Sequence, residues 1–222
     1  NYIFANRSFM GKDVCNYRAV GLKASFAPSA FPLSLEAGIF NPASTSSQTQ
    51  WSSTVAYSAK AAYRIIPDLK VATGFMSVIP YGRRANLIDA AITFTPGPFT
   101  FEAEYMNERY LNSSLPPCQA YNFYADYRIP VRWGIFNQWS AQARFDGMTA
   151  YSNLHPDADG QLSISQPRRN RLTIGSTIAW VRSANLFFEF KVNYEKYFYP
   201  SAVSPAGAGQ ADKLLAEMVL RF

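Results

Sequence analysis

The chain has 222 residues, of which 48% are apolar and 16% aromatic, and its formal net charge is +6. It contains no run of about 18 uncharged apolar residues, which excludes a membrane-spanning helix. Its 14 prolines, 12 glycines, 14 tyrosines and 17 phenylalanines are instead typical of many β-strands joined by frequent turns. A chain of this length predicts a single domain covering residues 1–222.

Taken in order, the chain alternates apolar and polar residues with a period of two, as expected of strands with one apolar and one wet face. Glu102 and Glu104, for example, share one face of their strand, opposite Phe101 and Ala103. Residues 1–9 contain a short strand-like piece. The alternation then predicts strands at 17–26, 33–39, 55–65, 69–75, 88–94, 99–106, 121–128, 138–146, 171–180, 186–195 and 213–222.

The connections between these strands alternate between short turns and longer polar loops, the longest running from Gly147 to about Arg169. Strands of about ten residues are long enough to cross a bilayer at a tilt. The sequence therefore predicts an all-β fold, a transmembrane antiparallel up-and-down β-barrel with about twelve strands in this stretch. A soluble β-sandwich also alternates, but it would seldom keep loop lengths in this strict order.

The last strand supplies the reference for the two faces. Leu214, Ala216, Met218 and Leu220 form its apolar row, and the chain ends on Phe222. A two-faced last strand that stops on Phe resembles the closing strand of bacterial outer-membrane β-barrels. Counting back from it assigns each loop to the short-turn side or the long-loop side.

The polar rows are predicted to face a lumen, in which basic and acidic strand residues balance. Opposite charges there are expected to form cross-strand pairs, for instance between the strand of Glu102 and Glu104 and the strand of Asp126 and Arg128. The candidate pore-lining residues are Lys23, Lys60, Arg64, Lys70, Glu102, Glu104, Asp126, Arg128, Arg144 and Lys191.

The net positive charge is therefore expected in loops and strand ends, mainly on the long-loop side. A basic rim could raise the local concentration of anions and steer them into a pore. The same side chains could instead bind lipopolysaccharide phosphates or be simply solvated. The candidate rim residues are Arg83, Arg84, Arg109, Arg168 and Arg169.

Three further features are candidate sites. Cys15 and Cys118 fall in loops on the same side, where they could form a disulfide in an oxidising compartment or stay as two thiols. His155 lies near two aspartates and could act as a base, but no nucleophile motif accompanies it. The segment DADG (Asp157–Gly160) is a fragment of a calcium-loop pattern without the later glutamate. We predict no catalytic residue and no metal site.

Three motifs resemble those of the phosphate-selective porin O/P family. They are FANRSF (Phe4–Phe9), with Asn6 where the family has Glu; YRAVGLKASF followed by LSLEAGIFN (Tyr17–Asn41); and FEAEYMNER (Phe101–Arg109). The resemblance implies a barrel of commonly sixteen strands that forms trimers and passes phosphate or other anions. It also implies that about four further strands would precede Asn1.

We therefore expect an outer-membrane porin for passive diffusion of small hydrophilic solutes, with a preference for anions or phosphate. The expected partners are outer-membrane lipid, lipopolysaccharide, small anions, two further copies of the chain in a trimer and other envelope proteins. We expect no enzyme activity, no cofactor and no nucleic acid. The alternatives are a non-conducting structural or complex-forming barrel and, less favoured, an outer-membrane hydrolase.

Overall fold

A computed structural model describes residues 8, 10, 14, 19–42, 50–79, 83–111, 115–156, 162–183, 185–200 and 211–222, with the backbone alone at 151–156 and 162–166. Within these ranges the chain forms thirteen β-strands. None of the described residues belongs to a helix long and apolar enough to cross a membrane.

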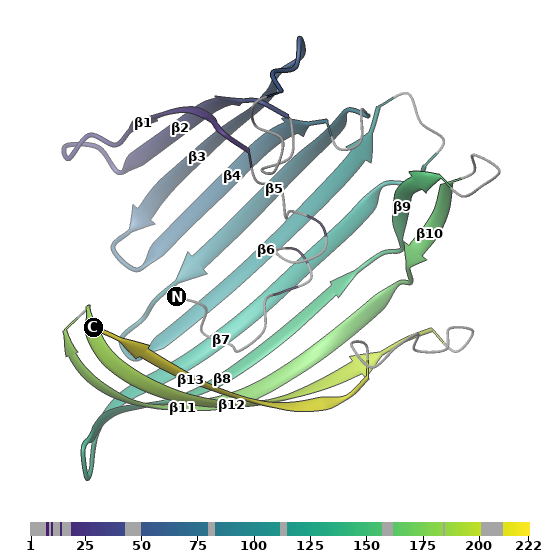
Figure 1. Ribbon diagram of the computed structural model, residues 1–222. Helices are drawn as coiled ribbons and strands as arrows, with labels where there is room; N and C mark the ends of the chain where they lie inside the picture. The colour runs from purple at the N-terminus through teal and green to yellow at the C-terminus, as the bar shows by residue number, and fades with distance from the viewer. Residues whose placement is uncertain are drawn as a thin grey trace.

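Eleven strands form one sheet in which each strand pairs with the next along the chain (Figure 1). They are β1 (Gly21–Phe26), β2 (Leu33–Phe40), β3 (Ala56–Ile66), β4 (Leu69–Val78), β5 (Ala85–Phe94), β6 (Phe99–Tyr110), β7 (Cys118–Trp133), β8 (Phe136–Met148), β11 (Arg169–Ser183), β12 (Leu186–Phe198) and β13 (Lys213–Arg221). All pairings in this sheet are antiparallel. This confirms the predicted all-β, up-and-down fold.

The eleven strands correspond one to one to the predicted segments from 17–26 to 213–222. The strand predicted in residues 1–9 lies outside the described residues apart from Ser8. Two strands were not predicted: β9 (Tyr151–Pro156) and β10 (Leu162–Gln166), which pair with each other inside the predicted longest loop. Two register shifts in this short hairpin interrupt the simple alternation on which strand prediction depends.

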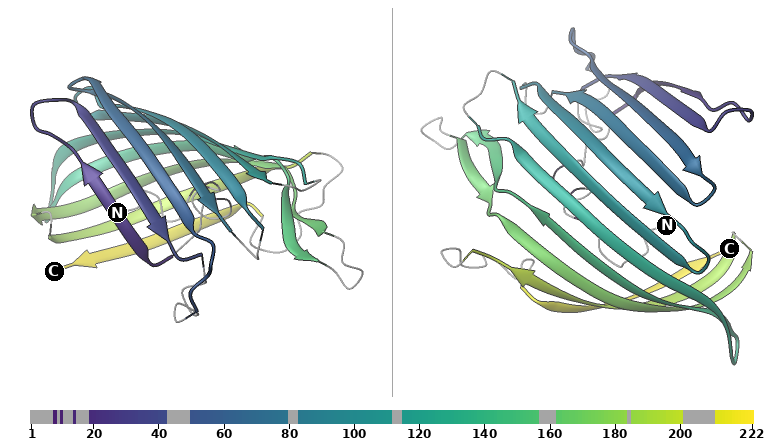
Figure 2. Two further views of the ribbon diagram at one scale, coloured as in Figure 1. Left: turned by 90° about the horizontal axis from the view of Figure 1, so that it is seen from above. Right: turned by 180° about the vertical axis from the view of Figure 1, so that it is seen from behind.

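The sheet curves into a trough, with β1 and β13 as its two edges (Figure 2). These two edge strands do not pair with each other in the part of the chain that the structure describes. Because each pairing reverses direction, the first and the eleventh strand run the same way. An antiparallel closure of the sheet would therefore need an odd number of additional strands between them.

Tight turns close one end of the sheet. Gly97, between β5 and β6, and Gly134, between β7 and β8, have φ of 59° and 60°. This left-handed conformation is open to glycine at little cost, so the two glycines allow the short connections that set the register on that side. The longer connections lie at the other end, called the long-loop end below.

Candidate functional site: the concave face of the sheet

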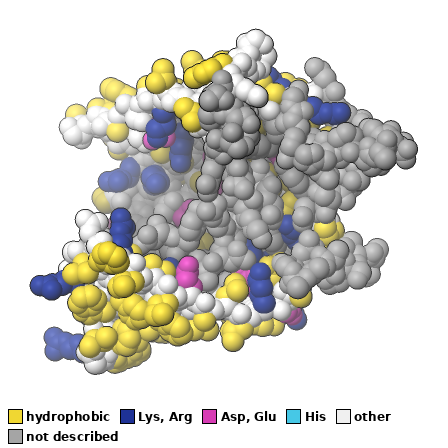
Figure 3. Space-filling model, in the orientation of Figure 1, with side chains coloured by type: hydrophobic (Ala, Val, Ile, Leu, Met, Phe, Trp, Pro, Cys, Tyr) yellow, Lys and Arg dark blue, Asp and Glu magenta, His cyan; other side chains and the backbone are white. Residues whose placement is uncertain are grey.

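One row of side chains runs across nine strands on a single face of the sheet. Its members are successive register partners, namely Arg64, Lys70, Thr93, Glu102, Tyr124, Arg144, Thr173, Glu195 and Lys213. Even spacing along each strand places nine of the ten predicted pore-lining residues on this same face, and Lys23 on β1 joins them through its register partner Gly38, which in turn is opposite Ser58 on β3. Lys, Arg, Asp and Glu side chains line the hollow of the trough in Figure 3, so this row belongs to the concave face.

The opposite, convex face is apolar and exposed. Leu22 on β1 is 83% exposed, Ile88 on β5 57%, Phe123 on β7 53%, Ile174 on β11 51% and Met218 on β13 68%. Exposed aliphatic and aromatic side chains along a whole sheet face cannot be stable in water without a partner. The sheet therefore separates a polar interior from an apolar exterior.

A buried ion cluster ties the concave sides of β8, β11 and β12 together. Arg171 donates to both carboxylate oxygens of Asp146, through Nε at 3.2 Å and Nη2 at 2.9 Å. Its Nη1 donates to Glu195 Oε1 at 3.2 Å. The exposure of Arg171 is 1%, and that of both carboxylates is 0%. These three residues are called the Arg171 cluster below.

Two further cations lie against the Arg171 cluster. Arg144 Nε lies 3.3 Å from Asp146 Oδ1, and its Nη2 lies 3.8 Å from Glu195 Oε1. Lys213 Nζ is 3.4 Å from Glu195 Oε2, which brings in the edge strand β13. Three cations surround two carboxylates here, so ion pairs connect the neighbouring strands and the net charge of this group is positive.

The prediction of ion pairs between β6 and β7 is wrong for the described residues. Among the described residues Arg128 pairs with Asp126 of its own strand, at 3.1 Å, and with neither Glu102 nor Glu104. The register places Glu102 opposite Tyr124, which removes the cross-strand partner. Register depends on the turns, and residue periodicity alone does not give it.

Most exposed charges of the concave face are basic. The exposed side chains are those of Lys23, Lys60, Arg64, Lys70, Arg128 and Arg221. The carboxylates of Asp89, Glu102 and Glu104 on this face are half-buried, whereas Glu36, whose side chain is 42% exposed, pairs with Lys23 at 3.3 Å. Arg64 and Lys70 are direct cross-strand partners, an arrangement in which like charges repel. The exposed charge of the described concave face is therefore mainly positive.

The five predicted rim arginines do not share one environment. Arg83 and Arg168 are exposed, whereas Arg169 is 4% exposed on the concave face, opposite Met148. Arg84 and Arg109 lie on the convex side, where Arg84 Nη1 donates to Ser77 Oγ at 2.8 Å. Their role as an anion-steering rim stays a prediction.

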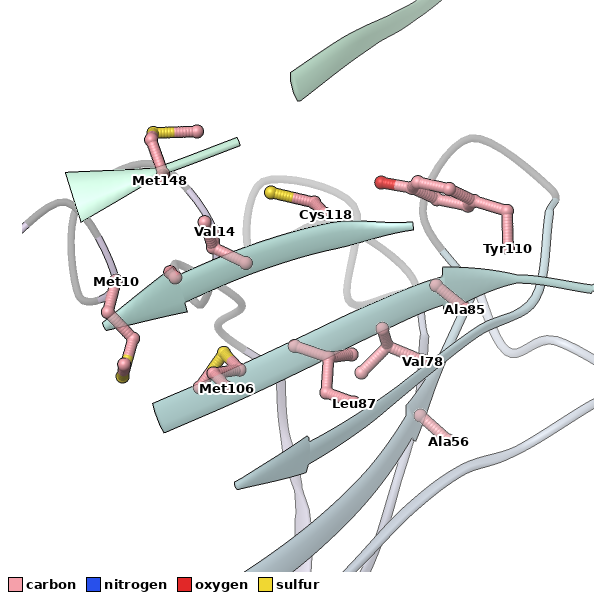
Figure 4. Packing of buried hydrophobic residues seen from close by; sticks show 11 residues of the cluster. Met10, Val14, Ala56, Val78, Ala85, Leu87, Met106, Tyr110, Cys118 and Met148 are labelled. Carbon is pink, nitrogen blue, oxygen red and sulfur yellow. The ribbon is translucent and has the colours of Figure 1, made fainter. Parts of the chain in front are cut away.

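An apolar cluster covers part of the concave face near the long-loop end (Figure 4). Met10 and Val14, far from these strands in sequence, are 3% and 1% exposed and pack into it. The cluster also includes Val78, Leu87, Met106, Tyr110, Cys118 and Met148. This contact was not predicted, although the apolar residues at inward positions, such as Leu87 and Met106, were a signal for it.

The other candidate sites lie wholly or partly outside the described residues. Cys118 is buried, but Cys15 lies outside the described residues, so their disulfide stays a prediction. His155 belongs to β9, whose side chains are not described, and Asp157–Gly160 lies outside the described residues. Within the described part of the chain no group of His, Cys, Asp and Glu side chains could hold a metal ion.

No protein-family model matches the chain, and no curated protein is significantly similar to it. The class of protein is therefore defined by the fold alone: an eleven-stranded, up-and-down antiparallel sheet with an apolar convex face and a charged concave face. The resemblance to phosphate-selective porins remains a proposal.

Proposed function

We propose that the chain forms the wall of an outer-membrane porin, through which small hydrophilic solutes diffuse passively. The observation that carries the proposal is the separation of the two faces: every strand of the sheet carries apolar residues on its convex side, while the concave side is lined by charged and polar ones. A sheet of this kind is stable when its convex face contacts lipid and its concave face encloses water.

Closure of the pore is part of the proposal. In lipid, the backbone groups of β1 and β13 need partners, because an unsatisfied group costs several kcal/mol there. The two strands run the same way, so an odd number of additional antiparallel strands is required. A barrel of sixteen strands, as the resemblance implies, meets this condition with five strands beyond the eleven described. Trimer formation is likewise proposed from that resemblance alone.

We further propose that the pore prefers anions. The support is the set of exposed basic side chains on the concave face, above all Lys60, Arg64 and Lys70 on adjacent strands β3 and β4. No carboxylate of the described residues lies within ion-pair distance of these three. Fixed positive charge on a narrow aqueous wall raises the local concentration of anions. Phosphate fits this chemistry, as do other small anions.

A non-conducting structural barrel is the second candidate. The observation that favours it is the filled concave face near the long-loop end, where Met10 and Val14 pack on the wall. The Arg171 cluster is also fully buried. If this filling blocks the lumen, the barrel serves as a scaffold for other envelope proteins.

Swelling of vesicles separates the two candidates. The protein is inserted into phosphatidylcholine vesicles loaded with dextran, and a small sugar such as arabinose is added at equal osmolarity. Swelling at a rate that falls with sugar size is expected of the porin. Insertion without swelling would instead support the scaffold.

A further inference from the structure

A groove of about 530 Å³ crosses the convex face over β1 to β5. Its floor consists of small side chains and its walls of large apolar ones. The floor is formed by Ala37, Ala59 and Ala61, and the walls include Phe26, Phe75 and Ile88. This volume is in the usual range of about 300–1,000 Å³ for small-molecule sites. The lining fits a hydrocarbon chain.

A guanidinium group lies at the long-loop end of this groove. Arg84 Nη1 donates to Ser77 Oγ at 2.8 Å, its Nη2 donates to the backbone oxygen of Val55 at 3.2 Å, and its Cζ lies 5.6 Å from the centre of the Tyr57 ring. These contacts hold the side chain flat on the convex face. No carboxylate of the described residues forms an ion pair with it.

The groove and the arginine are adjacent. Tyr57, Ser77 and Asn86 are successive register partners, and Phe75 and Ile88 of the groove lie two residues further along the same strands. The ring centroids of Tyr57 and Phe75 are 5.9 Å apart. The end of the groove that carries Arg84 is therefore continuous with the apolar wall of the groove.

Two more arginines belong to the same end of the sheet. Arg109 on β6 is the register partner of Asn86 and is exposed, as is Arg83. The backbone N–H of Leu111 donates to the oxygen of Arg84 at 2.8 Å, which holds the end of β6 beside Arg84. Arg84 and Arg109 therefore lie on the convex side at this end of the groove, and Arg83 is the exposed chain neighbour of Arg84.

We propose that this surface binds the lipid A part of lipopolysaccharide, with an acyl chain in the groove and a phosphate at Arg83, Arg84 and Arg109. The proposal rests on the outer-membrane orientation above, in which the long-loop end faces outward. Guanidinium groups match phosphate oxygens in geometry and charge. A basic cluster where an apolar face meets water lies at headgroup level.

The test uses the full chain purified in detergent and native mass spectrometry with added lipid A. Replacing the three arginines together (Arg83→Gln, Arg84→Gln, Arg109→Gln) is expected to weaken lipid A binding at least about tenfold. A matched control, Arg132→Gln with Arg182→Gln, removes two exposed arginines at the short-turn end and is expected to leave binding unchanged. Equal losses in both variants would overturn the proposal.

Two further experiments identify which molecule occupies the groove. Ala59→Phe fills the groove floor and is expected to weaken lipid A binding with the arginines intact. If this variant instead dissociates an oligomer while lipid A stays bound, the groove holds another copy of the chain and the proposal is wrong. Phosphatidylglycerol binding as tightly as lipid A, or displacement of lipid A by equimolar inorganic phosphate, would also contradict it.

Vesicle swelling gives an independent control on the proposed function. If the protein passes sugar but binds no lipid A, the lipid A proposal is wrong and the porin proposal is unaffected. If the protein binds lipid A at the three arginines but passes no sugar, the porin proposal is wrong and the lipid A proposal is unaffected.

Discussion

Arg171 on β11 and Asp146 on β8 form a two-pronged ion pair, with both hydrogen bonds at 2.9–3.2 Å and neither side chain more than 1% exposed. Arg171 also binds Glu195 on β12, so one guanidinium joins three strands. A buried pair of this kind adds little net stability over an apolar wall, but losing one partner leaves uncompensated buried charge. The first prediction follows from this asymmetry.

Arg171→Met should lower the free energy of unfolding by about 3–5 kcal/mol, because Asp146 and Glu195 stay buried with less compensation. Guanidinium unfolding in detergent, followed by tryptophan fluorescence, measures the change. The matched control is Lys23→Met, since Lys23 pairs with Glu36 at 3.3 Å in an exposed site. Its cost should stay below about 1 kcal/mol. Equal costs for the two variants would show that burial of the Arg171 cluster is unimportant.

The exposed basic wall of β3 and β4 should control ion preference. Neutralising Lys60, Arg64 and Lys70 to Gln is expected to reduce the anion-to-cation permeability ratio severalfold, because the fixed positive potential is lost. Reversal potentials in a potassium chloride gradient measure this ratio. Glu102→Gln with Glu104→Gln should raise the ratio instead. An unchanged ratio in the triple variant would place the selective charges elsewhere.

Met10 and Val14 should narrow the lumen. Met10→Asp with Val14→Asp puts two carboxylates into an apolar cluster, where burial of each charge costs several kcal/mol, so the contact should break. Single-channel conductance is then expected to rise. Met10→Leu conserves volume at a cost below about 1.5 kcal/mol and should leave conductance unchanged. A conductance equal to wild type in the double variant would mean that these residues do not restrict flow.

Asp212 should anchor the start of β13 in a pH-dependent way. It accepts from the Tyr197 backbone N–H at 2.8 Å and from Lys196 Nζ at 3.0 Å. The Tyr197 N–H and then Lys196 hold the pKa of this carboxyl below its ordinary value of 3.8. The stabilisation is therefore complete above that value and is lost as pH falls through the lowered pKa.

Hydrogen exchange at the Tyr197 amide measures this anchoring. Protection should be constant from neutral pH down to about 4, and it should fall at lower pH as the carboxyl titrates. Asp212→Asn should give weaker protection without this step. Protection that begins to fall well above pH 4 would contradict the lowered pKa.

The strands were predictable because the period of two is imposed by the backbone and repeats in every segment. The shared face of the ten predicted pore-lining residues follows from it, since nine lie an even number of positions from the row joining Arg64 to Lys213 and Lys23 joins that face through Gly38. The features that the sequence did not predict depend on strand register and on contacts between distant residues. Arg171, Asp146 and Glu195 come from three strands, and only their pairing shows that they meet.

The packing of Met10 and Val14 was hidden for the same reason. No local pattern shows which segment covers the inward apolar positions of Leu87 and Met106. The position of Arg84 on the convex face was hidden as well. The sequence places Arg84 in a loop, whereas its contacts with Ser77 and Tyr57 place it on the apolar convex face.

The most direct test of the porin proposal is the current through a planar phosphatidylcholine bilayer containing the purified protein, with a tenfold potassium chloride gradient. Stepwise conductance with a reversal potential of the sign given by chloride permeation is predicted, because the exposed charges of the concave face are mainly basic. Insertion without conductance, or a reversal potential of the sign given by potassium permeation, would contradict it.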